Sequence, residues 1–326
     1  MGTISKVMTE EQAVSRFVAD GDCIAMGGFV TNRRPYVFAR EIIRQKKRGL
    51  YLEGGPAAGD MDMLIGAGCV SVMIASYAAN SGYSQVCRQF RRAIETGAIL
   101  FDDYSLDVQT IIYHGAALGL PYVPVKNMLG SDLCNIWGIS EEERKKHPKL
   151  PGKKFVIQED PFDPGSLLCL VPAPEIDVAL IHAHTASPDG TFRIQGPLFQ
   201  DLDIAIAAKR TLVTCEEIIS DEEIRKRPEQ NTCTGLCVDA VVLAPHGAHP
   251  TQLFGKYDYD SAFLIEYDTA SRSEEGFHTF IEKYVTSRET HRDYLYFIGA
   301  DRLSALLVDE EYGFKRGMKR SREADE

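Results

Sequence analysis

The chain has no apolar run of about 20 residues and no excess of positive charge, and each shortage excludes a class of protein. Because a membrane-crossing helix needs about 20 apolar residues, we expect no span across a bilayer. Basic residues number 36 against 47 acidic ones, which gives a net charge of −11. That balance argues against nucleic acid or an anionic membrane as the main partner. Residues 1–11 are polar and contain no signal-peptide core.

The cysteines also lack a pattern. The chain has 8 of them, dispersed and mostly in apolar runs. No CxxC motif occurs, and Cys233 and Cys237 have the wrong spacing for a zinc knuckle. We therefore expect buried, reduced thiols and a cytoplasmic protein.

What the chain does have is an alternation of strand-like and helical segments. Apolar runs predict strands at 50–52, 70–76 and 122–125 and a short buried strand at 23–26. Those at 168–171, 178–183, 211–214 and 240–244 predict buried strands of the parallel type. Helical patterns occur at 12–19, 35–47, 84–96, 107–118, 205–209, 220–227 and 274–286. Thr9 and Gln12 form a predicted capping box before the first helix. The alternation predicts an α/β fold with an open, largely parallel doubly wound sheet and helices on both faces.

Composition divides the chain unevenly. Residues 1–308 are predicted to form a single domain, in which the polar, proline-rich segment near 140–166 is an excursion on the surface. Residues 309–326 are charged and poor in apolar side chains, so we expect this C-terminal tail to be mobile or to lie on a partner.

Glycine-rich segments follow several of the predicted strands, which is where ligands bind in open α/β sheets. After the first strand, Gly27-Gly28-Phe29 removes side chains from the backbone, so a substrate can approach it closely. The backbone N–H groups there are candidate donors to an acyl oxygen. The alternative interpretation is a simple tight turn.

Other strand ends carry polar residues that need the same weighing. Two such pairs are Asn80 with Ser81 and Gly130 with Ser131. Each pair could bind a substrate carboxylate or serve as an ordinary helix cap. Glu53 is a candidate nucleophile beside glycines at the end of a strand, or simply an exposed carboxylate. The carboxylates of Asp102, Asp103 and Asp107 fit helix capping better than general-base catalysis.

Four histidines and one cysteine suggest a metal site and a thiol nucleophile, which the sequence favours less. The candidate metal ligands are His182, His184, His246 and His249. Acidic or thiol ligands at matching spacing are missing, so we expect no metal site. Cys215 has no evident histidine partner, which favours a buried thiol over a nucleophile.

Residues 20–35 together resemble the N-terminal signature of the class I coenzyme A-transferases, and in particular the α subunit of glutaconate CoA-transferase. The resemblance rests on Asp20-Gly21, a short apolar run, Gly27-Gly28-Phe29 and Pro35, six residues after Phe29. Arg33 departs from it, because the signature usually has glycine there. Trp137-Gly-Ile-Ser140 and the segment 218–224 are longer, more specific matches, and the resemblance extends to at least Tyr294.

The resemblance implies a heteromeric enzyme with a β subunit of the same fold, as a heterotetramer or hetero-octamer. A glutamate of the β subunit is then the nucleophile, coenzyme A is a substrate and no cofactor is bound permanently. The expected substrate-binding residues are then Gly27, Gly28, Phe29, Asn80, Ser81, Gly130 and Ser131. A decarboxylase or hydrolase acting on acyl-CoA is the alternative on this scaffold. A ligand-sensing module is a third interpretation, which no basic DNA-binding segment supports.

Overall fold

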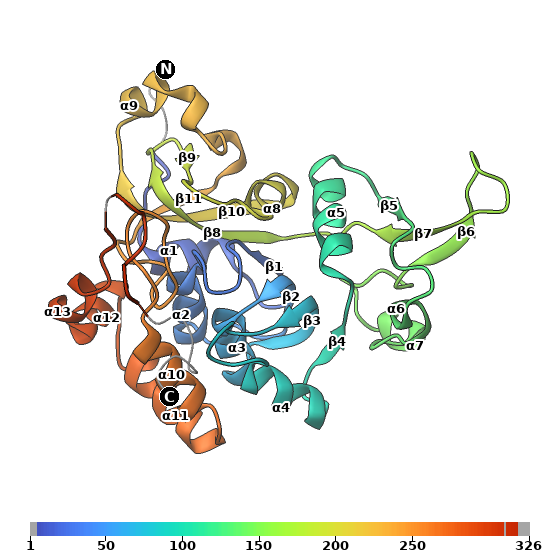
Figure 1. Cartoon of the computed structure of the whole chain (residues 1–326), viewed down its shortest axis with the longest axis horizontal. Coiled ribbons are helices and arrows are strands. Elements are labelled where there is room, and N and C mark those ends of the chain that lie inside the picture. The colour runs from blue at the N-terminus through green and yellow to red at the C-terminus, as the bar shows by residue number, and fades with distance from the viewer. Residues whose placement is uncertain (1–4, 310, 319–326) are drawn as a thin grey trace.

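A parallel sheet forms the centre of the protein (Figure 1). The structure is a computed structural model, and it describes residues 5–309 and 311–318. The strands of the main sheet are, in chain order, β1 (Cys23–Met26), β2 (Leu50–Ala57), β3 (Val70–Ala78), β4 (Leu100–Asp102), β8 (Val178–Ala186), β10 (Arg210–Ile218) and β11 (Ala240–Leu243), with β9 (Phe192–Arg193) antiparallel to β8. Their order in space is β11-β10-β8-β1-β2-β3-β4.

This order is that of a doubly wound sheet. From β1 the chain moves outward in one direction through β2, β3 and β4, and from β8 it moves in the other through β10 and β11. The switch therefore lies between β1 and β8, which pair in parallel. Ligands of such sheets bind in the crevice outside the carboxyl ends of the strands at the switch.

Helices cover both faces, as the sequence predicts. One face packs against α1 (Glu10–Phe17), α2 (Tyr36–Arg44), α3 (Gly59–Gly66), α4 (Arg88–Thr96), α10 (Ser261–Ala270) and α11 (Glu274–Ile281). The other face packs against α5 (Leu106–Ala117) and α8 (Asp201–Ala207). Three further helices are α9 (Asp221–Lys226), α12 (His291–Ile298) and α13 (Ala300–Ser304). The capping box predicted for Thr9 and Gln12 is present at the start of α1.

A second, smaller sheet projects from the main body (Figure 1). It consists of β5 (Tyr122–Val125), β6 (Val156–Glu159) and β7 (Leu167–Pro172), with the short helices α6 (Asp132–Asn135) and α7 (Glu141–Arg144) beside it. The prediction of a buried parallel strand at 168–171 is wrong, because β7 pairs antiparallel with both β5 and β6. The segment 140–166 lies within this unit, which we call the side sheet.

A buried ionic cluster attaches the side sheet to the body. Asp102, the last residue of β4, is fully buried and pairs with Arg144 of α7 and with Lys154, whose Nζ lies 2.9 Å from Asp102 Oδ1. Asp102 also accepts a hydrogen bond from the backbone N–H of Gly138. Buried charges are tolerated when they are paired and hydrogen-bonded in this way. Asp102 is therefore an anchor for the side sheet, and its carboxylate is not free for general-base chemistry.

The described part of the C-terminal tail lies on the chain itself. The backbone N–H of Lys315 donates to Asp258 Oδ2 and the N–H of Gly255 donates to the carbonyl of Gly313. Residues 311–318 are thus held on the chain by hydrogen bonds, and contact of the tail with a partner stays a prediction. Residues 310 and 319–326 of the predicted tail fall outside the described residues.

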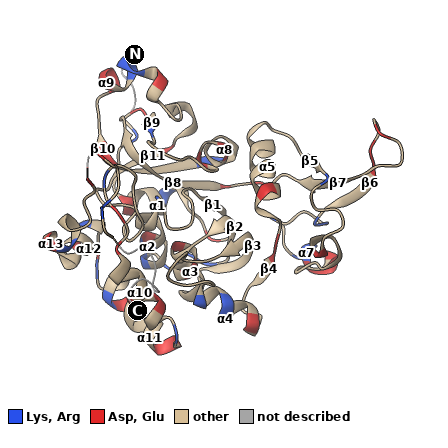
Figure 2. Ribbon diagram, viewed as in Figure 1, with Lys and Arg blue, Asp and Glu red and all other residues tan. Residues whose placement is uncertain are grey.

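Charged residues lie mainly on the outer helices and loops, whereas the central strands are nearly free of them (Figure 2). Arginines on α4 and glutamates on α11 are visible at the periphery. No helix in the described part of the chain is both long enough and apolar enough to cross a membrane.

Candidate functional site

The Gly27–Gly28 turn follows β1 directly at the topological switch. Gly28 has φ +81, and a Cβ there would lie 2.5 Å from the carbonyl oxygen of Arg33. A Cβ on Gly27 would overlap the carboxylate of Asp201. Only glycine fits both positions, because one needs a left-handed backbone and the other a close neighbour.

The backbone N–H groups of this turn are already used within the chain. Gly27 donates to the carbonyl of Leu180, Gly28 donates to Asp201 Oδ1 at 3.0 Å, and Phe29 donates to the carbonyl of Asn32. The hypothesis that these three N–H groups stabilise an acyl oxygen is therefore not supported. Contact of substrate with Gly27, Gly28 or Phe29 stays a prediction, which the half-exposed Phe29 ring suits.

Arg33 and Asp201 form a buried ion pair beneath the turn. Arg33 Nη1 and Nη2 lie 2.7 Å from the two carboxylate oxygens of Asp201, so the pair is bidentate. Burial alone raises the pKa of Asp201, but the Arg33 charge and hydrogen bonds hold it below its usual range. Arg33 has φ +56, the conformation that explains the usual glycine of the signature at this place. The pair with Asp201 offsets the strain of an arginine there.

Arg34 turns to the other side of the loop. Its Nε donates to Asp60 Oδ2 at 2.8 Å, and both side chains are fully buried. Asp60 lies in the first turn of α3, whose first residue Gly59 donates its N–H to Asn80 Oδ1 at 3.0 Å. The loops after β1, β2 and β3 thus meet at Arg34, Asp60 and Asn80.

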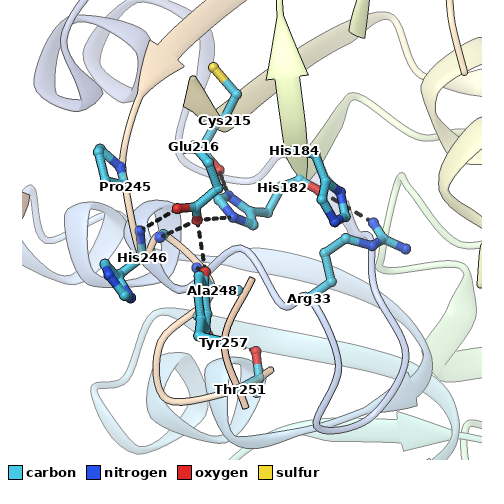
Figure 3. A network of polar contacts seen from close by, with 12 residues as sticks. Arg33, His182, His184, Cys215, Glu216, Pro245, His246, Ala248, Thr251 and Tyr257 are labelled. Atoms are coloured by element: carbon cyan, nitrogen blue, oxygen red, sulfur yellow. Dashed lines mark hydrogen bonds and ion pairs between the residues drawn. The ribbon is translucent and has the colours of Figure 1, made fainter. Parts of the chain in front are cut away.

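A second polar cluster holds the loop after β11 on the other side of the switch (Figure 3). The carboxylate of Glu216 accepts hydrogen bonds from His182 Nε2 at 2.9 Å, Tyr257 Oη at 2.8 Å and the His246 N–H at 2.8 Å. Burial alone raises the pKa of Glu216, but its hydrogen bond and charge interaction with His182, together with its other hydrogen bonds, lower it to about 2. Glu216 is therefore an ionised structural anchor at neutral pH.

The other histidines considered as metal ligands also have protein partners. His184 Nε2 donates to the carbonyl of Phe254 and its Nδ1 accepts from Gln195, while burial lowers its pKa to about 4. His249 lies between Asp260 and Tyr294. Within the described residues, no group of three or more His, Cys, Asp or Glu side chains is arranged to hold a metal ion.

Glu53 is buried in β2 on the face that α5 covers. Tyr113 of α5 donates a hydrogen bond to Glu53 Oε2 at 3.2 Å. Burial raises the pKa of Glu53 to about 8 and outweighs the opposing effects of Tyr113 and Arg144. A buried, largely protonated carboxyl group is a poor nucleophile at neutral pH. Cys215 is fully buried, and burial raises its pKa to about 12, so it is a core thiol.

The remaining predicted residues divide into two places. Asn80 is buried and caps α3, next to Arg34 and Asp60, while Ser81 is exposed in the same loop. Gly130 and Ser131 lie in the side sheet unit before α6, away from the switch (Figure 1). The Ser131 hydroxyl donates to the Met128 carbonyl. The structure thus brings Gly27, Gly28, Phe29 and Asn80 to one edge and leaves Gly130 and Ser131 outside it.

Sequence reasoning missed Arg34, Asp60, Asp201 and Glu216. Arg34 precedes Pro35 in the very segment that carries the resemblance, and a charged residue between a buried strand and a buried helix is the signal that was available. Asp201 and Glu216 come from segments some 170 residues and more along the chain. Only the parallel pairing of β1 with β8, and of β8 with β10, brings them near.

The fold is a doubly wound α/β sheet, a class whose ligands bind at the topological switch point, and comparison with known proteins gives the family. The family model described as Coenzyme A transferase matches residues 7–244. The chain belongs to the coenzyme A transferase family.

Two curated relatives cover nearly the whole chain. The A-subunit of glutaconate CoA-transferase from Acidaminococcus fermentans is 52% identical over 311 residues, which cover 95% of this chain and 97% of that protein. The A-subunit of 3-oxoadipate CoA-transferase from Pseudomonas knackmussii is 34% identical over 288 residues, covering 86% of this chain and 94% of that one.

Solved structures agree with the sequence comparison. The crystal structure of glutaconate coenzyme A-transferase from Acidaminococcus fermentans matches with a TM-score of 0.94 and 52% identity, over 95% of this chain and 98% of that one. A variant of the decarboxylase AibA/AibB matches with a TM-score of 0.71 and 28% identity, over 86% and 99% of the two chains.

Proposed function

We propose that this chain is the α subunit of a heteromeric CoA-transferase that moves coenzyme A between a short dicarboxylate, such as glutaconate, and a second carboxylate. The observation that carries the proposal is the 52% identity to the A-subunit of glutaconate CoA-transferase over 95% of this chain. Gly27, Gly28, Phe29, Asn80 and Ser81 remain the proposed substrate-facing residues at the carboxyl edge.

The geometry supports an active site to which two subunits contribute residues. Glu53 is buried and bonded to Tyr113, and the Cys215 thiol lies in the core. With neither group suited to attack a thioester, the nucleophilic glutamate is assigned to a β subunit of the same fold. Exposed apolar side chains near the switch, Phe29, Leu198 and Phe254, are 38%, 45% and 45% exposed and suit a subunit contact there.

In the proposed reaction, the β-subunit glutamate attacks the acyl-CoA carbonyl and expels the CoA thiolate, which forms a mixed anhydride. The thiolate then attacks the enzyme's own carbonyl, which releases the first carboxylate and leaves a glutamyl-CoA thioester. The acceptor carboxylate repeats these steps in reverse. Coenzyme A is thus a substrate, and no permanently bound cofactor is proposed.

We further propose that the enzyme is cytoplasmic and assembles as a heterotetramer or hetero-octamer. The location is supported by the cysteines, all of which are free thiols.

The test is to co-purify this chain with the product of its neighbouring gene and to supply glutaconyl-CoA and acetate. Acetyl-CoA and glutaconate are expected, together with a thioester on the β subunit that hydroxylamine cleaves and borohydride reduces. Either subunit by itself is the control. Carbon dioxide and crotonyl-CoA, or free coenzyme A, formed without acetate would instead indicate the decarboxylase or hydrolase alternative.

A further inference from the structure

Arg33 and Arg34 are adjacent arginines, both buried, but their hydrogen bonding differs. Both Nη atoms of Arg33 are bonded to Asp201. Arg34 uses only Nε, which donates to Asp60, and within the described residues its Nη1 and Nη2 have no hydrogen-bond partner. Arg34 is 0% exposed, so bulk water does not meet this need.

Leaving guanidinium donors unpaired in the interior is costly, and native proteins rarely do so without a functional reason. Two parallel Nη–H donors match the two oxygens of a carboxylate, which is why arginine is preferred where carboxylates are bound. Among the described residues, Asp60 Oδ1 is also without a hydrogen-bond partner, so the Asp60 carboxylate meets Arg34 through one oxygen only, and the free Nη1 and Nη2 donors match a second carboxylate.

The surroundings of Arg34 place it beside the proposed substrate edge. It follows the Gly27–Gly28 loop and contacts the first turn of α3, near the Asn80 side chain. Burial raises the pKa of the half-buried Tyr77 at the end of β3, and the nearby Arg34 charge opposes that shift. The Arg34 charge therefore acts on a side chain that is partly exposed.

The charge balance also allows an anion here. Asp60 pairs with Nε of Arg34, and the Asn80 side chain already caps the first N–H group of α3. The donors left for a further anion are therefore Nη1 and Nη2 of Arg34.

We infer that Arg34 binds the free carboxylate of the substrate, the one that does not form the thioester, and so selects dicarboxylic over monocarboxylic acyl groups. The inference rests on the proposed function, because it assigns a specificity residue to the same site. Both Nη atoms of Arg33 are already bonded to Asp201, so Arg33 holds the loop from which Arg34 projects.

The first test compares two donors that differ only in this carboxylate, glutaconyl-CoA and crotonyl-CoA, each with acetate and the co-purified complex. In Arg34→Gln, kcat/KM for glutaconyl-CoA is expected to fall about 100-fold while that for crotonyl-CoA changes less than about threefold. Arg91→Gln removes the same charge from the exposed face of α4 and is expected to change neither value. An equal loss with both donors would show a structural role and overturn the inference.

The second test needs no turnover, so it separates this inference from the proposed function. Calorimetry of the wild-type complex should show tighter binding of glutarate than of butyrate, and Arg34→Gln should abolish the difference. If the wild type shows no such preference, the inference is overturned even where transfer activity is present. If transfer is absent but the preference is found and depends on Arg34, the proposed function fails and the carboxylate site stands.

A third variant covers the case in which Arg34→Gln does not fold. Asp60→Asn keeps the shape of the side chain and removes the competing negative charge, so glutarate should bind several-fold more tightly. Unchanged or weaker binding in a folded Asp60→Asn complex would contradict the inference. Melting temperatures of all variants check that each complex is intact.

Discussion

Glu53 is a carboxyl group that the fold keeps largely uncharged near neutral pH. It lies in β2 under α5, where Tyr113 donates to it and burial raises its pKa to about 8. An unfolded glutamate has its ordinary pKa of 4.5. Between these two values the native state holds more protons than the unfolded state, so stability falls as the pH rises through this window.

We predict that Glu53→Gln stabilises the complex above about pH 6 and leaves transfer activity intact. Glutamine cannot ionise and still offers an oxygen to Tyr113, so the pH-dependent cost disappears. At pH 7 the gain in unfolding free energy is expected to be on the order of 3 kcal/mol, and at pH 5 it should fall below about 1 kcal/mol. Thermal unfolding at a series of pH values measures this, and a variant without transfer activity would restore Glu53 as a nucleophile.

The single-residue interpretations that fail from sequence have a common physical cause. The two glycines do lie at a strand end as predicted, but the use of their N–H groups depends on Asp201, far along the chain. In the same way, the unusual Arg33 is explained only by its bidentate partner. Local sequence predicts backbone conformation, whereas partners from distant strands decide which polar groups stay available.

At the scale of elements, the loop after β11 depends on one carboxylate. Glu216 of β10 bonds to the N–H groups of His246 and Gly247 and to Tyr257, which tie residues 245–257 to the sheet (Figure 3). His182 in β8 supplies the fourth hydrogen bond. Glu216 therefore connects two strands with the loop at the carboxyl edge.

We predict that Glu216→Gln loosens this loop and lowers stability at neutral pH by about 2–3 kcal/mol. The native pKa of about 2 lies below the ordinary 4.5, so this stabilisation is complete above 4.5 and is lost as the pH falls towards 2. The difference between wild type and variant should be constant from pH 7 to 5.5 and narrow below 4.5. Faster hydrogen exchange at 245–257 is the second readout.

The neighbouring Glu217→Gln is the matched control, because Glu217 is exposed on the same strand. It should change neither the melting temperature nor the exchange of the loop. Equal effects of the two variants would contradict an anchoring role for Glu216.

Most strands and helices were predictable because the periodicity of apolar residues is local information. The side sheet was not, since the apolar run at 168–171 has the composition of a buried parallel strand. The direction of β7 is set by the strands with which it pairs, β5 and β6, and β5 lies more than 40 residues earlier in the chain. The buried cluster of Asp102, Arg144 and Lys154 then fixes this unit on the body.

At the scale of the whole molecule, the proposed binding edge contains none of the candidate nucleophiles among the residues that the structure describes. Arg34 and Asn80 lie at that edge, while Glu53 faces the opposite layer under α5. If substrate binds at this edge as proposed, a second subunit has to supply the reacting group. The exposed apolar side chains beside the switch are the proposed contact with that subunit.

We predict that Phe254→Glu prevents assembly with the β subunit, because a charge in a desolvated apolar contact is strongly unfavourable. Phe254 is 45% exposed beside the switch, whereas Phe162, in the side sheet unit, is 94% exposed. Phe162→Glu is therefore the matched control. In co-purification with a tagged β subunit, Phe254→Glu should reduce recovery at least about tenfold, which corresponds to roughly 1.4 kcal/mol, and Phe162→Glu should not. Equal recovery of both variants would place the subunit contact elsewhere on the molecule.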